Sequence, residues 1–592
     1  MNHKISKIRI ENFKSIRNES FDLFDYTPLV GYNNAGKTNL IEAIKWILRK
    51  SSLSANYFND PTQPIVMEAT IDGINDQLLT RIADNHRTSI QPFLIDESLS
   101  IKRVQTQPGQ AVAQIRLFVR IPNPEDGQDE WQANPTGIDN AIKDLFPEPI
   151  HIGAMENSEE DVSKSKSTTT IGKLLGEIFG PIETRYGENI RTVLHELKEI
   201  MDAEGGHRAA ELTEFDTSVN QKIDSFFPDI NIRVHVPTPE LKEVFSKGTI
   251  KVYENQLPEG RDVSALGHGA QRSIQMALVR HLSDIQRAVG TLTSTTLLLI
   301  DEPELYLHPQ AIEIIRESLK ALAGQNYQII FSTHSPVMIT SKDVANTILI
   351  RKNATQGTFR RQSLRSAIPQ VEIDAASQLV LLFSLSNSSN ILFSERVILA
   401  EGKTENRLMP TLVQKVTGRA LGLHKIAFVP QNGSGNTRKS MMVLNVMDLP
   451  TKALVDLDFC FKNAISDGFI NSNDPDIVAC STHLRLIAAS NGISLGQDGW
   501  PIRNNTMSSA EAFSILASQT QIRTNIENLK TKMLNHNIWI WKKGTIENHL
   551  NLTSKTEQEW SRFNTLLDTN ELNAILPNDF QEIIDCVNWI TN

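Results

Sequence analysis

The feature that most constrains the fold is a glycine-rich stretch between an apolar run and a helical pattern. Its residues match G-x-x-x-x-G-K-[ST] and read Gly31-Tyr32-Asn33-Asn34-Ala35-Gly36-Lys37-Thr38. Leu29 and Val30 precede the stretch, and apolar residues recur at helical spacing from Leu40 to Leu48 after it. A strand, a glycine turn and a helix in this order predict an α/β domain whose helix N-terminus cradles phosphates with backbone N–H groups.

The same stretch predicts roles for individual side chains. Lys37 would reach the β and γ phosphates of a nucleotide, and the hydroxyl of Thr38 would bind Mg²⁺. A chance glycine turn is the alternative, and the strand-loop-helix context disfavours it. The nucleotide-binding residues predicted from the loop are Gly31, Asn34, Gly36, Lys37, Thr38 and Asn39.

A second apolar strand, over residues 296–301, ends in two acids. Asp301 would hold the water shell of Mg²⁺, and Glu302 would polarise the attacking water as a catalytic residue. His334 ends the next strand, where it could contact a γ phosphate. The alternatives are that the acids cap the helix expected from Gln310 onward and that the histidine is structural.

Length and composition limit the class of protein. A chain of 592 residues is too long for a single core, so we expect three or four units. The net charge of −10 shows no overall basic character, although basic residues can still line one groove. Three cysteines without metal-type spacing indicate neither a disulfide framework nor a zinc site. No apolar run is long enough for a membrane span, and no signal peptide is evident at the start, so we expect a cytoplasmic protein without membrane contact.

Two helical stripes interrupt the strand pattern. Apolar residues recur from Ile190 to Met201 and again from Leu212 to Ile223, with Gly205 and Gly206 between them. Two antiparallel helices with one apolar face each must bury those faces, and a second copy of the chain is our preferred partner. Packing on the chain's own core is nearly as plausible. Before the stripes we expect a polar connector over 158–170, and after them strands over 230–253.

A third group of acids follows another set of short apolar strands. Glu401 and Glu405 lie at and just beyond the end of a strand over 396–400, and Asp456 and Asp458 follow a strand over 452–455. Alternating strands and helices predict a parallel sheet, so these carboxylates should meet at one edge. Mg²⁺ takes few protein oxygens and keeps other positions for water and phosphate, which suits such a cluster. Helix capping is the alternative for Glu401 and Asp456.

The nucleotide motifs resemble those of the ABC-type ATPase heads found in chromosome-maintenance and DNA-repair proteins. In that family two heads sandwich ATP, and each completes the other's site with a Leu-Ser-Gly-Gly-Gln loop. The matching stretch here begins at Ala265, so the resemblance assigns Gly269 and Gln271 to nucleotide binding. His268 occupies the serine position, which puts the rate of hydrolysis in question more than ATP binding.

The acidic pattern resembles the Toprim domain of topoisomerases, primases and certain nucleases. An ABC head followed by a Toprim domain is similar to the overcoming-lysogenisation-defect (OLD) nucleases along nearly the whole chain. The resemblance adds Lys543 as a catalytic charge near the scissile phosphate and Glu547 as a further metal ligand. It implies a two-metal site with Mg²⁺, for which Mn²⁺ or Ca²⁺ can substitute, and the metal ligands are Glu401, Glu405, Asp456, Asp458 and Glu547.

This resemblance fixes the expected fold class and domains. The class is α/β, with an ABC/SMC-like ATPase head that carries an inserted helical dimerisation element, followed by a Rossmann-like Toprim domain. The ATPase head spans 1–165 and 229–350 around the helical insert at 166–228. A linker at 351–393 precedes the Toprim nuclease domain at 394–592.

The leading hypothesis is an ATP-regulated, Mg²⁺-dependent DNA endonuclease used in defence against phage. Its partners would be DNA and a second copy of the chain, as a homodimer or homotetramer. A helicase or a retron reverse transcriptase with its msDNA is a further partner that the resemblance allows. The alternative is an ATP-gated sensor or scaffold that binds nucleic acid while its nuclease is silent or partner-dependent. A primase-like polymerase is a third reading, which lacks a template-binding or zinc module.

Overall fold

The computed structural model describes residues 3–80, 82–121, 130–146, 149–153, 170–239, 241–246, 250–253, 259–288, 295–370, 388–431 and 433–592. The expected polar connector lies outside this description except for Thr170, which begins a helix. The chain divides into two compact units, one of residues 1–29, 33–338 and 352–359 and the other of residues 30–32, 339–351 and 360–592. Among the described residues, no helix combines the length and apolar character needed to cross a membrane.

The first unit begins with antiparallel strands. Their order is β7-β6-β5-β4-β1-β2-β14, and every neighbouring pair is antiparallel. Buried and exposed residues alternate along β4, as expected for strands with only one face in the core. The strands are β1 (Lys4–Phe13), β2 (Ile16–Asp22), β4 (Ile65–Asp72), β5 (Leu99–Gln105), β6 (Arg116–Arg120), β7 (Trp131–Ala133) and β14 (Gly357–Arg360).

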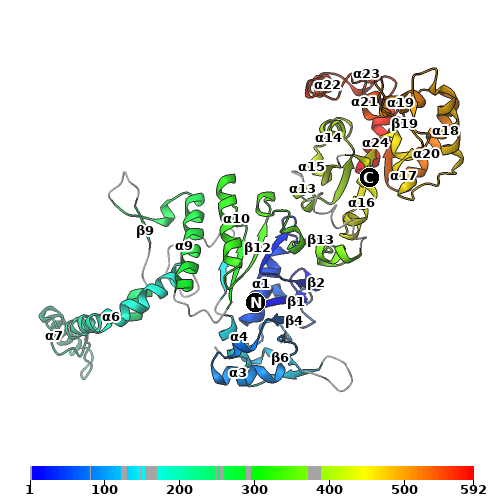
Figure 1. The fold of residues 1–592 in the computed structure, drawn as a ribbon. Coiled ribbons are helices and arrows are strands. Elements are labelled where there is room, and N and C mark those ends of the chain that lie inside the picture. The colour runs from blue at the N-terminus through cyan, green and yellow to red at the C-terminus, as the bar shows by residue number, and fades with distance from the viewer. Residues whose placement is uncertain are drawn as a thin grey trace. The chain divides into compact units, whose positions relative to one another are not determined.

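A second run of strands in this unit carries the nucleotide motifs. Its order is β3-β12-β11-β8, and β11 pairs in parallel with both β12 and β8. Every residue of β11 and β12 is buried, because α1 contacts both strands and α10 covers β12 (Figure 1). These elements are β3 (Tyr26–Val30), β8 (Ile150–Ile152), β11 (Thr296–Asp301), β12 (Tyr327–Thr333), α1 (Lys37–Leu48), α9 (His268–Ala288) and α10 (Pro309–Ala323).

Two helices form where the helical stripes predict them, α6 (Thr170–Met201) and α7 (Ala210–Ile223). Several large apolar side chains of this region are exposed, and they are Tyr186, Val193, Leu197, Ile200, Phe215, Phe226, Phe227 and Ile230. The apolar faces of the two helices are therefore only partly covered within one chain.

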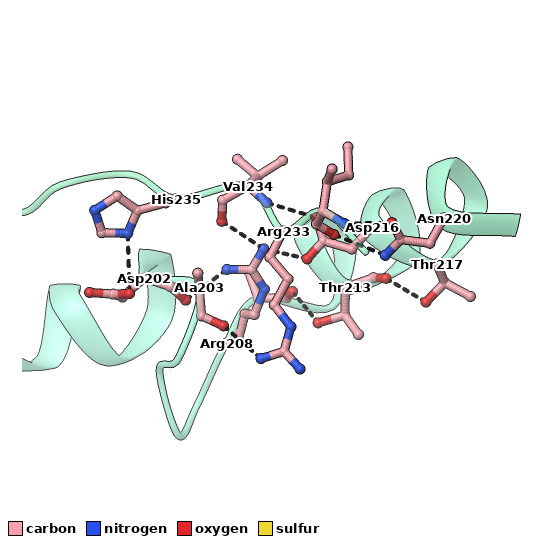
Figure 2. Close-up of polar contacts among 12 residues, drawn as sticks. Asp202, Ala203, Arg208, Thr213, Asp216, Thr217, Asn220, Arg233, Val234 and His235 are labelled. Atoms are coloured by element: carbon pink, nitrogen blue, oxygen red, sulfur yellow. Dashed lines mark hydrogen bonds and ion pairs between the residues drawn. The ribbon is translucent and has the colours of Figure 1, made fainter. Parts of the chain in front are cut away.

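The strands expected over 230–253 are wrong for most of that range. Residues 230–239 have no regular structure and α8 (Leu241–Ser246) follows. Among the described residues of this range, only Lys251–Val252 forms a strand, β9. Figure 2 shows why the extended segment needs no neighbouring strand. Side chains from the helical region satisfy its backbone: Asn220 bonds both the N–H and the carbonyl of Ile232, and Asp216 accepts from the N–H of Val234 at 2.9 Å.

The second unit contains a four-stranded parallel sheet in the order β16-β15-β17-β20. Its strands are β15 (Arg396–Ala400), β16 (Ile426–Pro430), β17 (Thr451–Val455) and β20 (Ile538–Ile540). Helices α14 (Lys403–Thr417) and α24 (Phe580–Thr591) pack together over a core that includes Trp541 and Phe563. The other long helices are α16 (Thr437–Val446), α18 (Pro475–Ala488), α19 (Ser509–Ala517), α20 (Arg523–Leu534) and α22 (Glu557–Thr569).

Candidate active site

The phosphate loop connects β3 to α1 and requires glycine at position 36. Gly36 has φ +105°, and a Cβ there would lie 2.3 Å from Thr358 Oγ1. Thr358 comes from β14, donates to the carbonyl of Ala35 at 2.8 Å and pairs with Ser15 Oγ at 2.7 Å. Asn39 donates to the same Ser15 oxygen, so this predicted nucleotide-binding side chain braces the loop.

The catalytic residues expected for ATP hydrolysis lie together. Lys37 Nζ lies 2.7 Å from His334 Nε2, which in turn lies 3.5 Å from a carboxylate oxygen of Glu302. Burial lowers the pKa of His334, and the charge of Lys37 lowers it further. The imidazole is therefore neutral and its Nε2 accepts from the Lys37 ammonium.

The two residues expected to hold the nucleotide's Mg²⁺ are also neighbours. Thr38 Oγ1 donates to Asp301 Oδ1 at 3.2 Å, and Ser332 Oγ donates to the same oxygen at 2.9 Å. Glu304 is a member of the site that sequence analysis missed, although it stands in the same acidic run as Asp301. Its carboxylate accepts from the N–H of His334 at 2.7 Å and so orients the histidine loop.

The signature stretch that begins at Ala265 packs against the loop that follows β11. The amide of Gln271 is buried and donates to the carbonyl of Leu266 at 2.8 Å. His268 stacks on Tyr306, with ring centroids 5.1 Å apart, and a Cβ at Gly269 would lie 2.8 Å from the Tyr306 carbonyl. Arg272 was not predicted, and it donates to the carbonyl of Asp301 at 2.7 Å. In one chain, α9 is therefore attached to the loop after β11.

In the second unit, acids lie at the carboxyl edge of the parallel sheet. Glu401 follows β15 and Asp456 follows β17, the strand beside it. A carboxylate oxygen of Glu401 accepts from the backbone N–H of Asp456 at 2.8 Å. Glu405 and Glu547 lie in the first turns of α14 and α21 (Ile546–Leu550), and Thr404 donates to Glu547 at 2.6 Å. The predicted acids thus come from two strand ends and two helix starts.

Burial and mutual repulsion disfavour the charged forms of these acids. Burial, then the charge of Asp458, raises the pKa of Glu401 to about 7. Burial also raises the pKa of Glu405 to about 7 and lifts that of Asp456 well above its ordinary value. Burial likewise raises the pKa of Asp458. A cluster of carboxylates gathered in a dry site is suited to binding a cation.

The donor set fits a hard divalent cation. Asp456 Oδ1 and Asp458 Oδ1 are buried and have no hydrogen-bond partner. Carboxylate oxygens are the protein ligands that Mg²⁺ prefers. No group of three or more His, Cys, Asp or Glu side chains in the described part of the chain is arranged to hold an ion as it stands.

Lys543 was predicted for this region, and Lys555 was not. Lys543 Nζ forms an ion pair with Asp579 Oδ2 at 2.6 Å. Lys555 lies 3.2 Å from Glu547 Oε2. Burial lowers the pKa of Lys555, but the charges of Asp456 and Glu547 outweigh it and raise that pKa overall. No sequence pattern marks Lys555, because it sits in a polar loop after α21.

Comparison with known proteins identifies both units. Residues 4–102 and 128–339 match the AAA ATPase domain family, and residues 392–458 match the TOPRIM domain of overcoming lysogenization defect protein-like sequences. The chain is 36% identical to the Old nuclease of Escherichia phage P2 over 602 aligned positions, which cover all of both chains. It is 22% identical to the endonuclease GajA of Bacillus cereus strain VD045 over 436 positions, covering 70% of this chain and 68% of that protein.

Among solved structures, an SMC head bound to the C-winged helix domain of ScpA is 15% identical, with a TM-score of 0.35. The likeness covers 61% of this chain and 99% of that chain. The family matches confirm the predicted ATPase and Toprim domains, and with them the α/β fold class. An ATPase domain binds nucleotide and a Toprim domain uses a divalent metal, so both classes of cofactor follow. The roles of individual residues stay predictions.

Proposed function

Because this chain belongs to the OLD nuclease family, we propose that it is a Mg²⁺-dependent DNA endonuclease whose Toprim domain works under the control of ATP. The observation that carries the proposal is the acidic cluster at the carboxyl edge of the parallel sheet. Its buried carboxylates have raised pKa values, and two of their oxygens lack partners. Such a cluster has little structural use without a cation.

Each residue has a proposed task. Glu401, Asp456 and Asp458 would hold one Mg²⁺, and Glu405 and Glu547 would serve a second. When bound, the metals would stabilise the attacking and leaving oxygens during in-line hydrolysis of a phosphodiester. Lys543, which is half exposed, would meet the charge of the scissile phosphate. Lys555 would neutralise the acids before the metals bind.

Control by ATP is supported by the position of Tyr32. This residue belongs to the second unit although it is the second residue of the phosphate loop. Its ring lies 4.3 Å from the ammonium of Lys425, which directly precedes β16, and 4.9 Å from the guanidinium carbon of Arg351. ATP control would run along the chain itself, because Lys37 follows Tyr32 by five residues in the same loop. With His268 at the signature serine position, ATP would serve as a bound switch more than as a rapidly spent fuel.

Self-association is proposed for the helical region of α6 and α7. Large apolar side chains are exposed there, among them Val193 at 63% and Phe226 at 77%. A second copy of the chain would cover such a surface, because contiguous exposed apolar patches on soluble proteins mark interaction sites. A role in defence against phage is also proposed, and it rests on the family alone.

Cleavage of supercoiled plasmid DNA tests the proposal. The full chain should nick or linearise the plasmid with Mg²⁺, and EDTA should stop it. Asp458→Asn should abolish cleavage while ATP binding stays unchanged, because Asp458 lies outside the nucleotide site. The exposed Asp568→Asn on α22 is the matched control and should cleave like the wild type. Undiminished cleavage by Asp458→Asn would remove the acidic cluster from the mechanism and leave the sensor or scaffold reading.

A further inference from the structure

Lys543 is held at three points by groups that the proposed mechanism does not use. Its ammonium pairs with Asp579 Oδ2 at 2.6 Å. Its backbone N–H donates to His549 Nε2 at 3.1 Å, and its carbonyl accepts from Asn548 Nδ2 at 2.7 Å. Both the side chain and the backbone of this one residue are therefore fixed.

His549 and Asp579 act as a pair. His549 Nδ1 lies 2.8 Å from Asp579 Oδ1, opposite the oxygen that pairs with Lys543. Because His549 Nε2 accepts from a backbone N–H, its ring proton belongs on Nδ1 and is donated to Asp579. Although burial opposes it, the hydrogen bonds from His549 and Lys543 keep the pKa of Asp579 below its ordinary value. The Asp579 carboxylate thus bonds His549 through one oxygen and Lys543 through the other.

The turn that carries Lys543 is attached to the acidic cluster. Leu457, which stands between Asp456 and Asp458, donates its N–H to the carbonyl of Gly544 at 2.8 Å. Gly544 has φ +102°, and a Cβ there would lie 2.4 Å from Ser514 Oγ. The turn therefore sits directly against the Asp456–Asp458 loop, and helix α21 with Glu547 starts two residues after it.

The side chains of Lys543, His549 and Asp579 differ in their exposure to solvent. All three residues line a cavity of about 980 Å³, but the side chain of Lys543 is 48% exposed and those of His549 and Asp579 are 2% and 5% exposed. The ammonium of Lys543 is therefore the group of the three that is open to a DNA phosphate. We propose that Asp579 and His549 are positioning residues that hold Lys543 in place for phosphodiester cleavage.

This proposal rests on the proposed nuclease function, so its test begins by measuring that function. The nuclease function is established first, by showing that the wild type cleaves DNA and that Asp458→Asn does not. If Asp579→Asn then has no effect, the positioning proposal fails while the nuclease function stands. Asp579→Asn keeps the size and the acceptor for His549 but removes the charge that pairs with Lys543. In the full chain, we expect single-turnover cleavage at saturating DNA to fall about 10- to 100-fold, the range for lost supporting contacts. DNA affinity measured in EDTA should change less than about twofold.

A double mutant separates positioning from a merely structural role. If Asp579 acts through Lys543, Asp579→Asn should slow the residual cleavage of Lys543→Ala by less than about twofold, because the residue it positions is already gone. The exposed Asp568→Asn, on α22 of the same unit and outside this cavity, is the control and should cleave like the wild type. Unchanged cleavage by Asp579→Asn overturns the proposal, as does an equal loss in both backgrounds. If Asp579→Asn does not fold, His549→Gln takes its place with the same expectations.

Discussion

Replacing Glu405 by glutamine should stabilise the metal-free protein at alkaline pH. The side chain is 2% exposed, and burial raises the pKa of its carboxyl from 4.5 to about 7. A rise of about 2.5 pH units corresponds to about 3 kcal/mol between the two protonation states. Because the folded protein favours the protonated form, the contribution to stability is complete below pH 4.5 and is lost as the pH rises to about 7.

The assay is thermal unfolding of the full chain in EDTA between pH 5 and pH 8.5. For a unit of this size, about 3 kcal/mol corresponds to a shift of roughly 6 °C or more in the midpoint of thermal unfolding. As the pH rises, the midpoint of the wild type should therefore fall by that amount relative to the midpoint of Glu405→Gln. Mg²⁺ should restore the wild type at pH 8 by binding the folded state, and it should restore the variant less. Equal pH dependence for both proteins would refute the claim that Glu405 is kept in a dry, like-charged site.

Three further predictions concern other parts of the chain. Gly544→Ala should cost about 1–3 kcal/mol more than Gly418→Ala in chemical unfolding. Both glycines have positive φ, but a Cβ at Gly544 would clash with Ser514 Oγ at 2.4 Å, whereas a Cβ at Gly418 would have nothing within 4 Å. Lys37→Ala should abolish ATP binding measured by calorimetry and leave nucleotide-free cleavage in Mg²⁺ unchanged. Val193→Asp should lower the mass measured by light scattering if α6 joins two copies, whereas Glu188→Asp on the exposed side of the same helix should not.

Asp301, Glu401 and Asp456 could be predicted because each ends or follows an apolar strand that is visible in the sequence, whereas Glu547 was predicted from the family resemblance. Parallel strands bring their carboxyl ends to one edge, so Glu401 and Asp456 meet although 55 residues separate them. Thr38 and Asp301 were each predicted to serve the nucleotide's Mg²⁺, and the structure has them in contact. These contacts depend on local pattern and on topology, which short motifs encode.

The partners of those residues could not be predicted in this way. Asp579 lies at the start of α24 and His549 in α21, and only the packing of the Toprim domain brings them to Lys543. The error over 230–253 has a similar origin. An extended segment reads as a strand in sequence, but here side chains such as Asn220 supply the bonds that a neighbouring strand would supply.

Binding of Mn²⁺ to the full chain without nucleotide tests the central claim most directly, because Mn²⁺ is paramagnetic and can stand in for Mg²⁺. Titration followed by electron paramagnetic resonance should show bound metal in the wild type and in Lys37→Ala. Asp456→Asn should bind at least about tenfold more weakly, because it removes a charged ligand from the acidic cluster. Equal binding by Asp456→Asn and the wild type would contradict the assignment of the metal to the carboxyl edge of this sheet.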